Sequence, residues 1–393
     1  MSAPSVTDLP RRLGHVLCLD DFEALARRHL PAPLFAYVSG GVERNQSVRA
    51  NARAFDQFEF ITRVLVNTAG RSTATQLFGQ TWSAPFGIAP MGICAMTAYR
   101  GDVVLAQAAA REQIPMLVSG SSLIPMEAIH RVNPDAWFQA YLPGQDAQIQ
   151  ALVERVKAAG YGTLVVTLDV AIAANRENNV RAGFSTPLRP SLRLAWEGVT
   201  HPRWLLGTFA RTLLNHGMPH FENNHAERGA PIVSSHVLRD YSDRGHLTWD
   251  HLRWVREMWP GRLVVKGILD VQDARQAVEC GVDGLIVSNH GGRQLDGTVS
   301  PLRVLPGIVQ TCPEVPVMID SGFRRGTDVL KALAMGAKFV FIGRPFNYAA
   351  AVAGEAGVRK AASLLREEVS RDLAMLGVSR VEQLKAERLV AAA

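Results

Sequence analysis

Short apolar runs alternate with amphipathic segments through most of the chain, from residue 84 to about residue 350. Eight of these runs are rich in Val, Ile, Leu and Phe, and each is five or six residues long. Uninterrupted apolar runs of this length are typical of parallel strands that are buried on both faces. The predicted strands are residues 84–89, 115–119, 136–141, 163–168, 262–267, 283–288, 315–319 and 339–343.

The segments between the predicted strands have helical periodicity, and several end at a glycine such as Gly160, Gly281 or Gly336. Glycine is the residue at which a helix most often terminates. Eight consecutive strand–helix units occupy roughly the 250 residues that a TIM barrel requires. We therefore predict one α/β domain, a (β/α)8 TIM barrel over residues 84–350. Its predicted helices include residues 101–112, 145–159, 271–280, 302–311 and 325–336.

Three segments lie outside this alternation. Residues 1–80 form an N-terminal extension, with helical patterns near 20–29 and 33–43 followed by a loop-rich stretch. Residues 183–247 interrupt the fourth strand–helix unit, and so long a loop inside a compact domain is usually functional or disordered. Residues 355–393 are predicted to form C-terminal helices.

The insertion at 183–247 holds six of the eleven histidines, but their spacing matches no metal-ligand pattern, so we predict no metal site. Residues 201–215 predict a short basic amphipathic helix. Such a helix suits shallow binding to a membrane surface, and a lid or a subunit contact is the alternative. Its apolar residues are Trp204, Leu205, Leu206, Phe209, Leu213 and Leu214, flanked by Arg203 and Arg211.

Composition narrows the class of protein. The four cysteines include no CxxC pair, which argues against a disulfide framework and fits a reducing, cytoplasmic compartment. The first twenty residues lack the apolar core of a secretory signal, and no run reaches the roughly 18 apolar residues that span a bilayer. The net charge of +6 comes without a Lys/Arg run. An anionic substrate, a phosphate cofactor or an anionic membrane surface therefore explains it better than nucleic acid does.

Polar residues follow the predicted strands at their carboxyl ends, where TIM barrels hold their active sites. The loops after strands seven and eight combine glycines with arginines and predict the phosphate site common in this fold. That feature indicates a phosphorylated ligand but not a reaction, because other phosphate-binding barrels share it. The residues at the strand ends are Ser119, Gln139, Tyr141, Thr167, Asp169, Lys266, Ser288, His290, Asp320, Gly322, Arg324, Gly343 and Arg344.

The most specific segment is Val-Ser-Asn-His-Gly-Gly-Arg-Gln-Leu-Asp at 287–296. It places a proton acceptor, His290, three residues before a fixed cation, Arg293, at the end of a predicted strand. Imidazole titrates near neutral pH, and a guanidinium group binds a carboxylate through two parallel hydrogen bonds. The pair therefore suits a small 2-hydroxy carboxylate whose acid group binds Arg293 and whose hydroxyl proton passes to His290.

This decapeptide resembles the active-site signature of the FMN-dependent 2-hydroxy acid dehydrogenase and oxidase family, which includes glycolate oxidases, L-lactate dehydrogenases and (S)-mandelate dehydrogenases. The resemblance runs from about residue 20 to about residue 380. It implies an FMN cofactor, oxidation of an (S)-2-hydroxy acid to a 2-oxo acid, and a homotetramer. Two parts of the insertion, from Gly198 and from Asn215, look like segments of mandelate dehydrogenases, and the first also looks like bacterial L-lactate dehydrogenases.

The resemblance also implies roles for individual residues. FMN phosphate would be held by Gly322, Arg324, Gly343 and Arg344, with Asp320 on the ribityl chain. The flavin ring would contact Pro90, Met91, Gly92, Ser119, Gln139, Thr167, Lys266 and Ser288, with Lys266 stabilising the charge of the reduced ring.

On the substrate side, Arg293 and Tyr37 match the family's carboxylate-binding pair, and Tyr141 matches the tyrosine at the substrate hydroxyl. His290 matches the base, Asp169 the carboxylate that stabilises its protonated form, and Arg176 a second active-site arginine. Tyr37 lies outside the predicted barrel, so we expect the N-terminal extension to fold over the barrel mouth.

Two departures from the family pattern enlarge the predicted pocket. Oxidase members tend to carry Ala at Gly92, and glycolate oxidases carry Trp at Ser121; Met91 stands where Thr or Ser is frequent. Both smaller residues point toward a substrate larger than glycolate, with mandelate-like acids first and L-lactate second.

In family members with a similar insertion, that segment attaches the enzyme to the membrane, where quinone accepts the electrons. We therefore expect quinone or another non-oxygen acceptor, and an enzyme that is cytoplasmic or peripheral on the inner membrane. An oxidase that reduces oxygen to hydrogen peroxide is the alternative. Two mechanisms stay open: His290 removes either the α-proton, or the hydroxyl proton while hydride leaves C2.

Overall fold

The computed structural model describes residues 13–235 and 244–392. Eight strands form one parallel sheet in the order β4-β11-β10-β9-β8-β7-β6-β5, and a bridge between Ile88 and Met116 joins the two ends of this order. The predicted TIM barrel is confirmed, and each predicted strand overlaps one strand of the barrel. The strands are β4 (Phe86–Ile88), β5 (Leu117–Ser119), β6 (Trp137–Ala140), β7 (Thr163–Thr167), β8 (Arg262–Ile268), β9 (Gly284–Val287), β10 (Val317–Asp320) and β11 (Phe339–Ile342).

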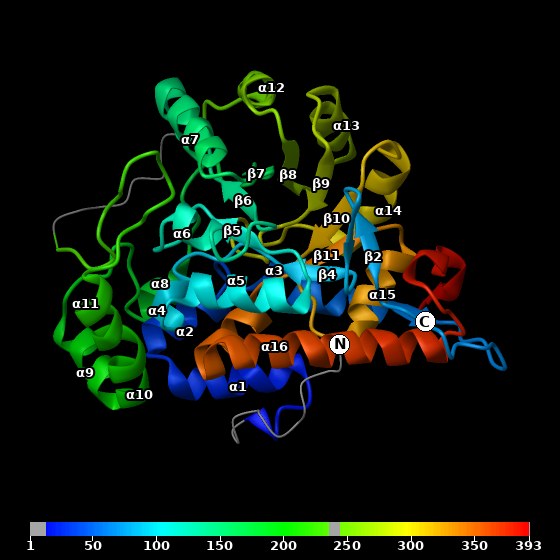
Figure 1. The fold of residues 1–393 in the computed structure, drawn as a ribbon, viewed down its shortest axis with the longest axis horizontal. Coiled ribbons are helices and arrows are strands. Elements are labelled where there is room, and N and C mark those ends of the chain that lie inside the picture. Colours follow the sequence, from blue (N-terminus) through cyan, green and yellow to red (C-terminus); the bar gives the residue numbers. More distant parts are fainter. Residues whose placement is uncertain (1–12, 236–243, 393) are drawn as a thin grey trace.

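Helices surround this barrel (Figure 1). The five barrel helices for which ranges were predicted begin and end within two residues of those ranges, because apolar periodicity and terminal glycines mark helix ends well. For example, Asp270 caps α13 by accepting hydrogen bonds from the backbone N–H groups of Gln272 and Asp273. The barrel helices include α5 (Gly101–Glu112), α6 (Met126–His130), α7 (Asp146–Ala158), α12 (Trp249–Met258), α13 (Val271–Glu279), α14 (Pro301–Thr311) and α15 (Gly326–Ala334).

Alternate strand residues enter two separate apolar clusters. Val165, Val264, Ile286 and Met318 point into the barrel, where they pack with Trp82 of a hairpin, β2 (Thr75–Leu77) and β3 (Gln80–Trp82). Their neighbours along the same strands pack outward against the helices. The interior of the barrel is therefore filled with side chains, and ligands are left to its mouth.

The N-terminal extension supplies α1 (Leu19–His29), α2 (Ala32–Ser39) and a third helix, α3 (Gln46–Arg53), that the sequence patterns did not predict. The last long helix, α16 (Arg344–Met375), crosses the expected boundary of the barrel and is kinked at Ala353 and Gly354. After it, β12 (Leu389–Ala391) pairs with β1 (Phe58–Phe60), where only helices were expected. A strand of the N-terminal extension thus pairs with the C-terminal segment in a small sheet.

The insertion contains α9 (Leu192–Thr200) and a helical stretch from 202 to 216, built of α10 (Pro202–Trp204), a π-helical turn (Leu205–Ala210) and α11 (Arg211–His216). A helix was predicted here, but its apolar residues do not share one face. Trp204 is buried, and its indole N–H donates to the carbonyl of Met96, whereas Leu206 and Leu214 are exposed. Among the described residues, no helix is long and apolar enough to cross a membrane.

Candidate active site

The turn after β9 has an unusual backbone. His290, Gly291 and Gly292 all adopt positive φ angles, of 56°, 66° and 72°. Glycine accepts this conformation freely, but a histidine in it is uncommon and is held there by its surroundings. The backbone N–H of His290 donates to Ser288 Oγ at 3.0 Å, and that of Gly291 donates to Ser321 Oγ at 3.0 Å. The turn thus directs the imidazole into the barrel mouth.

His290 is oriented by Asp169, which follows β7. His290 Nδ1 lies 2.8 Å from Asp169 Oδ1. Because an ionised carboxylate only accepts hydrogen bonds, Nδ1 carries the proton and Nε2 is left as the basic nitrogen. Burial would raise the pKa of Asp169, but the charge of His290 and its hydrogen bond lower it below its ordinary value. The carboxylate therefore stays ionised beside the ring.

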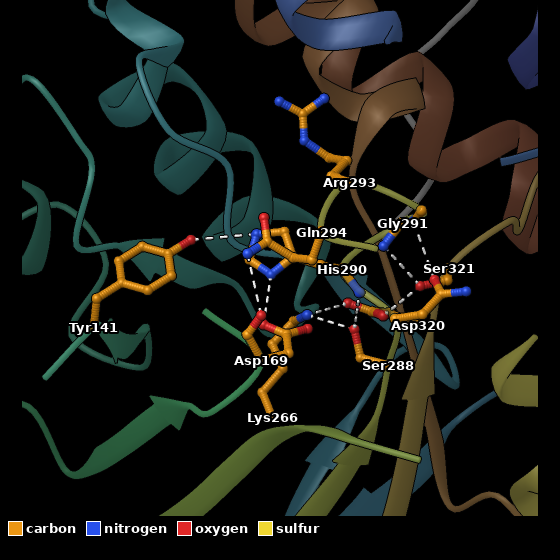
Figure 2. A network of polar contacts seen from close by, with 12 residues as sticks. Tyr141, Asp169, Lys266, Ser288, His290, Gly291, Arg293, Gln294, Asp320 and Ser321 are labelled. Atoms are coloured by element: carbon orange, nitrogen blue, oxygen red, sulfur yellow. Dashed lines mark hydrogen bonds and ion pairs between the residues drawn. The ribbon is translucent and has the colours of Figure 1, made fainter. Parts of the chain in front are cut away.

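The pKa of His290 itself is lowered from 6.5, because burial disfavours the imidazolium more than Asp169 favours it. The ring is therefore neutral near pH 7, with a free base at Nε2. Tyr141 OH lies 3.4 Å from that nitrogen, and Figure 2 shows the phenol pointing at the ring. A group that binds beside both the phenol and the imidazole has both a hydrogen-bond partner and a proton acceptor.

Lys266, at the end of β8, forms a buried ion pair. Its Nζ lies 2.9 Å from Asp320 Oδ2 and 2.7 Å from Ser288 Oγ, and Ser321 Oγ in turn donates to Asp320 Oδ1 at 2.9 Å. Figure 2 shows this network next to the pair of His290 and Asp169. Three neighbouring strands thus hold an ammonium group at the mouth with its charge already balanced.

The residue after Lys266 has to be glycine. Gly267 has a φ of 105°, and a Cβ atom there would lie only 2.8 Å from both Cβ and Cγ of Asp169. A larger residue would push Asp169 away from His290. The glycine at position 267 therefore allows β8 to approach the end of β7 closely.

Arg293 contacts the N-terminal extension rather than His290. Its Nη1 donates to the carbonyls of Tyr37 and Gly40, each at 2.7 Å, and the guanidinium lies 5.0 Å from the centre of the Tyr37 ring. Figure 2 shows the side chain directed away from the imidazole. The expected partners Arg293 and Tyr37 are therefore brought together, at the C-terminal end of α2.

Arg344 binds the same end of α2, donating to the carbonyls of Val38 and Gly40 at 3.0 Å. Arg324, in contrast, lies near two carboxylates of α1: its Nε is 3.3 Å from Asp20 and its Nη2 is 4.0 Å from Glu23. The extension thus contacts arginines at the barrel mouth that the sequence assigned to ligands.

These residues surround a cavity of about 350 Å³, within the range of small-molecule sites. Burial and nearby arginines lower the pKa of Arg293 to about 9, and burial lowers that of Arg344 to about 10. The cavity therefore favours anions. The predicted residues that line it are Tyr37, Pro90, Met91, Gly92, Ser121, Tyr141, Thr167, Arg176, Lys266, His290, Arg293, Asp320, Gly322, Arg324, Gly343 and Arg344.

Four predicted residues lie behind this lining. Asp169 and Ser288 hold His290 and Lys266, and Ser119 Oγ accepts a hydrogen bond from the backbone of Ser121 at 3.1 Å. The fourth, Gln139, is fully buried and weakly accepts from Gly120 N at 3.4 Å. Gln139 Nε2 and Thr167 Oγ1 are buried with no hydrogen-bond partner among the described residues. A ligand that supplies acceptors there would remove this cost.

Comparison with known proteins identifies the family. The profile of the family described as "FMN-dependent dehydrogenase" matches residues 26–391. The chain belongs to this family. An L-lactate dehydrogenase of Ectopseudomonas mendocina (strain ymp) is 39% identical over 379 residues, which cover 94% of this chain and 97% of the relative.

An (S)-mandelate dehydrogenase of Pseudomonas putida is 36% identical over 372 residues, covering 94% of this chain and 93% of the relative. The crystal structure of the monotopic membrane protein (S)-mandelate dehydrogenase matches with a TM-score of 0.87 and 36% identity, covering 96% of this chain and all of that one. Fold, family and FMN dependence thus agree with the sequence motifs.

The cavity fits the family's cofactor. FMN combines a ring edge rich in hydrogen-bond acceptors with a phosphate dianion. The unpartnered groups of Gln139 and Thr167 offer donors for such a ring, and the cationic arginines suit a phosphate.

Three features of the site had no separate sequence signal. Asn51 of α3 and Asn289 form two reciprocal side-chain hydrogen bonds of 2.8 and 2.7 Å, which tie the extension to the signature. Ser321 Oγ donates a hydrogen bond to Asp320 and accepts one from the backbone N–H of Gly291. Arg244, at the end of the insertion, reaches the cavity. Asn289 and Ser321 lie inside segments that the motifs had marked, but Arg244 does not.

Proposed function

We propose that this enzyme oxidises an (S)-2-hydroxy acid, mandelate-like or L-lactate, to the 2-oxo acid and passes the electrons to quinone or another non-oxygen acceptor. The observation that carries the proposal is the neutral, oriented imidazole: His290 Nδ1 is fixed by Asp169, and Nε2 lies 3.4 Å from Tyr141 OH at the wall of a cationic cavity. A 2-hydroxy acid matches this site because its hydroxyl proton can pass to His290 and its carboxylate can bind the cationic groups of the cavity.

In this proposal Arg293, Tyr37 and Arg176 bind the substrate carboxylate, and Tyr141 hydrogen-bonds the 2-hydroxyl. His290 Nε2 takes the hydroxyl proton while the hydrogen on C2 leaves with its electron pair, and Asp169 stabilises the imidazolium. FMN, when bound, accepts those two electrons, and Lys266 supplies positive charge for the reduced ring. Removal of the α-proton by His290 is the alternative order of events.

The residues proposed to hold FMN line the same cavity or, for Ser119, Gln139 and Ser288, lie directly behind its lining. Gly322, Arg324, Gly343 and Arg344 would bind the phosphate, and Asp320 the ribityl chain. Ser119, Gln139, Thr167, Ser288 and the loop of Pro90, Met91 and Gly92 would contact the ring. Arg344 donates through Nε and Nη2 to backbone carbonyls, and its positive charge would also favour a phosphate, to which hydrogen bonds are stronger.

Anaerobic mixing of the FMN-loaded enzyme with (S)-mandelate, L-lactate and glycolate in turn, followed by flavin absorbance, tests the proposal. Rapid bleaching by mandelate or lactate is expected, with slow recovery of colour in air and fast recovery with a soluble quinone. A yellow protein that none of the acids bleaches would refute the substrate class. Fast recovery in air with release of peroxide would make the enzyme an oxidase.

We also infer that the insertion attaches the enzyme to a membrane. Five large apolar side chains of α9 and the 202–216 stretch are 63–92% exposed: Leu192, Trp196, Val199, Leu206 and Leu214. Exposed Arg193, Arg203 and Arg211 lie among them, and this mixture suits an anionic lipid surface. The similar mandelate dehydrogenase is described as monotopic, which supports the proposal.

Cosedimentation with anionic vesicles tests this attachment. The double variant Trp196→Ser/Leu206→Ser should lose binding, whereas Val64→Ser/Leu65→Ser, which also removes exposed apolar groups but lies far along the chain, should not. Equal binding by both variants would contradict the assignment. Sedimentation velocity of the detergent-free protein tests the homotetramer that the family suggests.

A further inference from the structure

The side chain of Arg176 reaches the cavity from the loop between β7 and α8 (Glu177–Arg181). Its Nε donates to the backbone carbonyl of Arg293 at 3.3 Å, and its Nη2 donates to Gln294 Oε1 at 2.8 Å. Both acceptors belong to consecutive residues of the signature at 287–296. The turn that carries the base therefore also holds a guanidinium group that a different segment of the chain supplies.

The side-chain amide of Gln294 is held at both ends. Its Nε2 donates to the backbone carbonyl of Asp169 at 3.1 Å, and Figure 2 shows Gln294 beside Asp169. Its Oε1 accepts from Arg176. A carbonyl oxygen only accepts hydrogen bonds and a guanidinium group only donates them, so these partners fix which end of the amide faces which. Position 294 therefore requires a donor at one end and an acceptor at the other, and an amide provides both without a charge.

The neutrality of these contacts matters because Arg176 acts through its charge. Both acceptors of Arg176 are uncharged, so they position the guanidinium without forming an ion pair with it. After burial, Arg176 contributes to lowering the pKa of His290, and it contributes to lowering that of Arg293 to about 9. All of these side chains line the cavity. A carboxylate that enters it is therefore attracted by a guanidinium that is already held in place.

We propose that Gln294 is a positioning residue for the substrate carboxylate site: it holds Arg176 in the cavity in its charged form and ties it to the backbone of Asp169. The inference rests on the proposed function, whose carboxylate site it extends. It gives a role to a residue for which the sequence motifs predicted none.

Two variants of similar side-chain size test this role. Gln294→Glu keeps an acceptor for Arg176 but adds a charge that pairs with it, and it removes the donor for the carbonyl of Asp169. Gln294→Met is neutral and removes both hydrogen bonds. Gln272→Glu is the control, because Gln272 is an exposed residue of α13 and the change adds the same charge outside the cavity lining.

Binding of a carboxylate and of its neutral amide separates this role from packing. Benzoylformate and benzoylformamide, and the smaller pair pyruvate and pyruvamide, are titrated against the oxidised FMN-loaded enzyme, and the shift in flavin absorbance gives each Kd. In Gln294→Glu the Kd of the acid should rise by about 10- to 100-fold, the usual value of a hydrogen bond to a charged group, while that of the amide changes little. In Gln294→Met the rise should be about 3- to 10-fold, because Arg176 keeps its charge but loses its support.

Equal weakening of acid and amide in Gln294→Glu would indicate a role in packing alone and would overturn the proposal, and so would an acid Kd that stays at its native value. If neither acid binds the native enzyme, both the inference and the substrate class are refuted. Weakening confined to the acids supports the inference even if no hydroxy acid is oxidised. Turnover of mandelate or lactate without that selective weakening would leave the proposed function standing and refute the role of Gln294.

The pH profile of kcat/KM gives a second measurement that packing alone does not change. The charged and titratable groups that face His290 are Tyr141, Asp169, Arg176 and Lys266. A carboxylate at position 294 would offset the charge of Arg176 and raise the pKa of His290. The acid limb of the profile should therefore move to higher pH in Gln294→Glu and keep its native position in Gln272→Glu. A limb that stays in place or moves to lower pH in Gln294→Glu would contradict the pairing with Arg176.

Discussion

Lys266, Asp320 and His290, at the ends of β8 to β10, each have a charged or polar protein partner, whereas Gln139 Nε2 and Thr167 Oγ1, on β6 and β7, have none among the described residues. All five lie at the same rim of one barrel. The first group is organised by the protein alone, so its geometry exists before any ligand binds. The second group keeps a desolvation cost that only a ligand can remove. Changes in the first should impair chemistry or stability, and changes in the second should impair cofactor binding.

The largest effect is expected from His290→Gln. Gln keeps much of the volume of the side chain but cannot accept a proton, so kcat should fall by about 10⁴-fold, the upper end of what a positioned base contributes. FMN should stay bound, because the cofactor contacts lie elsewhere in the cavity. Flavin absorbance and single-turnover reduction measure the two quantities together. Near-native reduction would exclude His290 as the base.

Asp169→Asn should lower the rate less, by about 10²-fold, the lower end of what a positioned base contributes, because the base remains but its tautomer is no longer fixed. The pH profile gives a second readout. In the native free enzyme, kcat/KM should fall as the pH drops through the pKa of His290, which burial places below 6.5. Asp169 raises that pKa, so its removal should move the acid limb to still lower pH. A limb that moves upward would contradict this electrostatic role.

A paired comparison of Thr167→Val with Ser288→Ala contrasts directly the residues that have protein partners with those that have none among the described residues. Both changes remove one buried hydroxyl at a strand end. Ser288 Oγ has two partners, Lys266 and the backbone of His290, so its loss should reduce the free energy of unfolding of the apoprotein by about 1–3 kcal/mol.

Thr167 Oγ1 has no partner among the described residues, so Val there should leave apoprotein stability unchanged or higher. The same change should raise the Kd for FMN by about tenfold, the value of one hydrogen bond. Chemical denaturation of the apoprotein and fluorescence titration with FMN measure the two effects. A loss of apoprotein stability in Thr167→Val equal to that in Ser288→Ala would remove the distinction between the two sides.

The barrel was predictable because strand burial and helix ends are local properties of the sequence. The positions at strand ends followed from the barrel, since parallel strands bring their carboxyl ends to one rim. What could not be predicted are contacts between segments that fold far apart in the chain. Asn51 meets Asn289 across 238 residues, and Arg293 binds backbone carbonyls 253 residues away. Backbone carbonyl acceptors have no sequence signature. The hydrogen bonds of Arg293 and Arg344 to the carbonyls at the end of α2 could therefore be found only from the structure.

The smallest expected effect concerns Gly92, which belongs to neither of the two groups of residues compared above. A Cβ there would lie 2.9 Å from Ser121 Cβ and 3.0 Å from Tyr37 OH, closer than ordinary contacts. Tyr37 OH is the end of a long side chain and can move, whereas Ser121 Cβ is fixed to its backbone, so Gly92→Ala should displace the loop locally and narrow the pocket. We expect kcat/KM for mandelate to fall a few-fold more than that for lactate, at the low end of what one methyl group changes in a pocket. Ser121→Ala is the matched control, since it removes an atom beside the same contact and should not disfavour mandelate. An equal fall for both acids in Gly92→Ala would mean that Gly92 serves the cofactor loop rather than substrate size, and would place it with the ligand-dependent side of the rim.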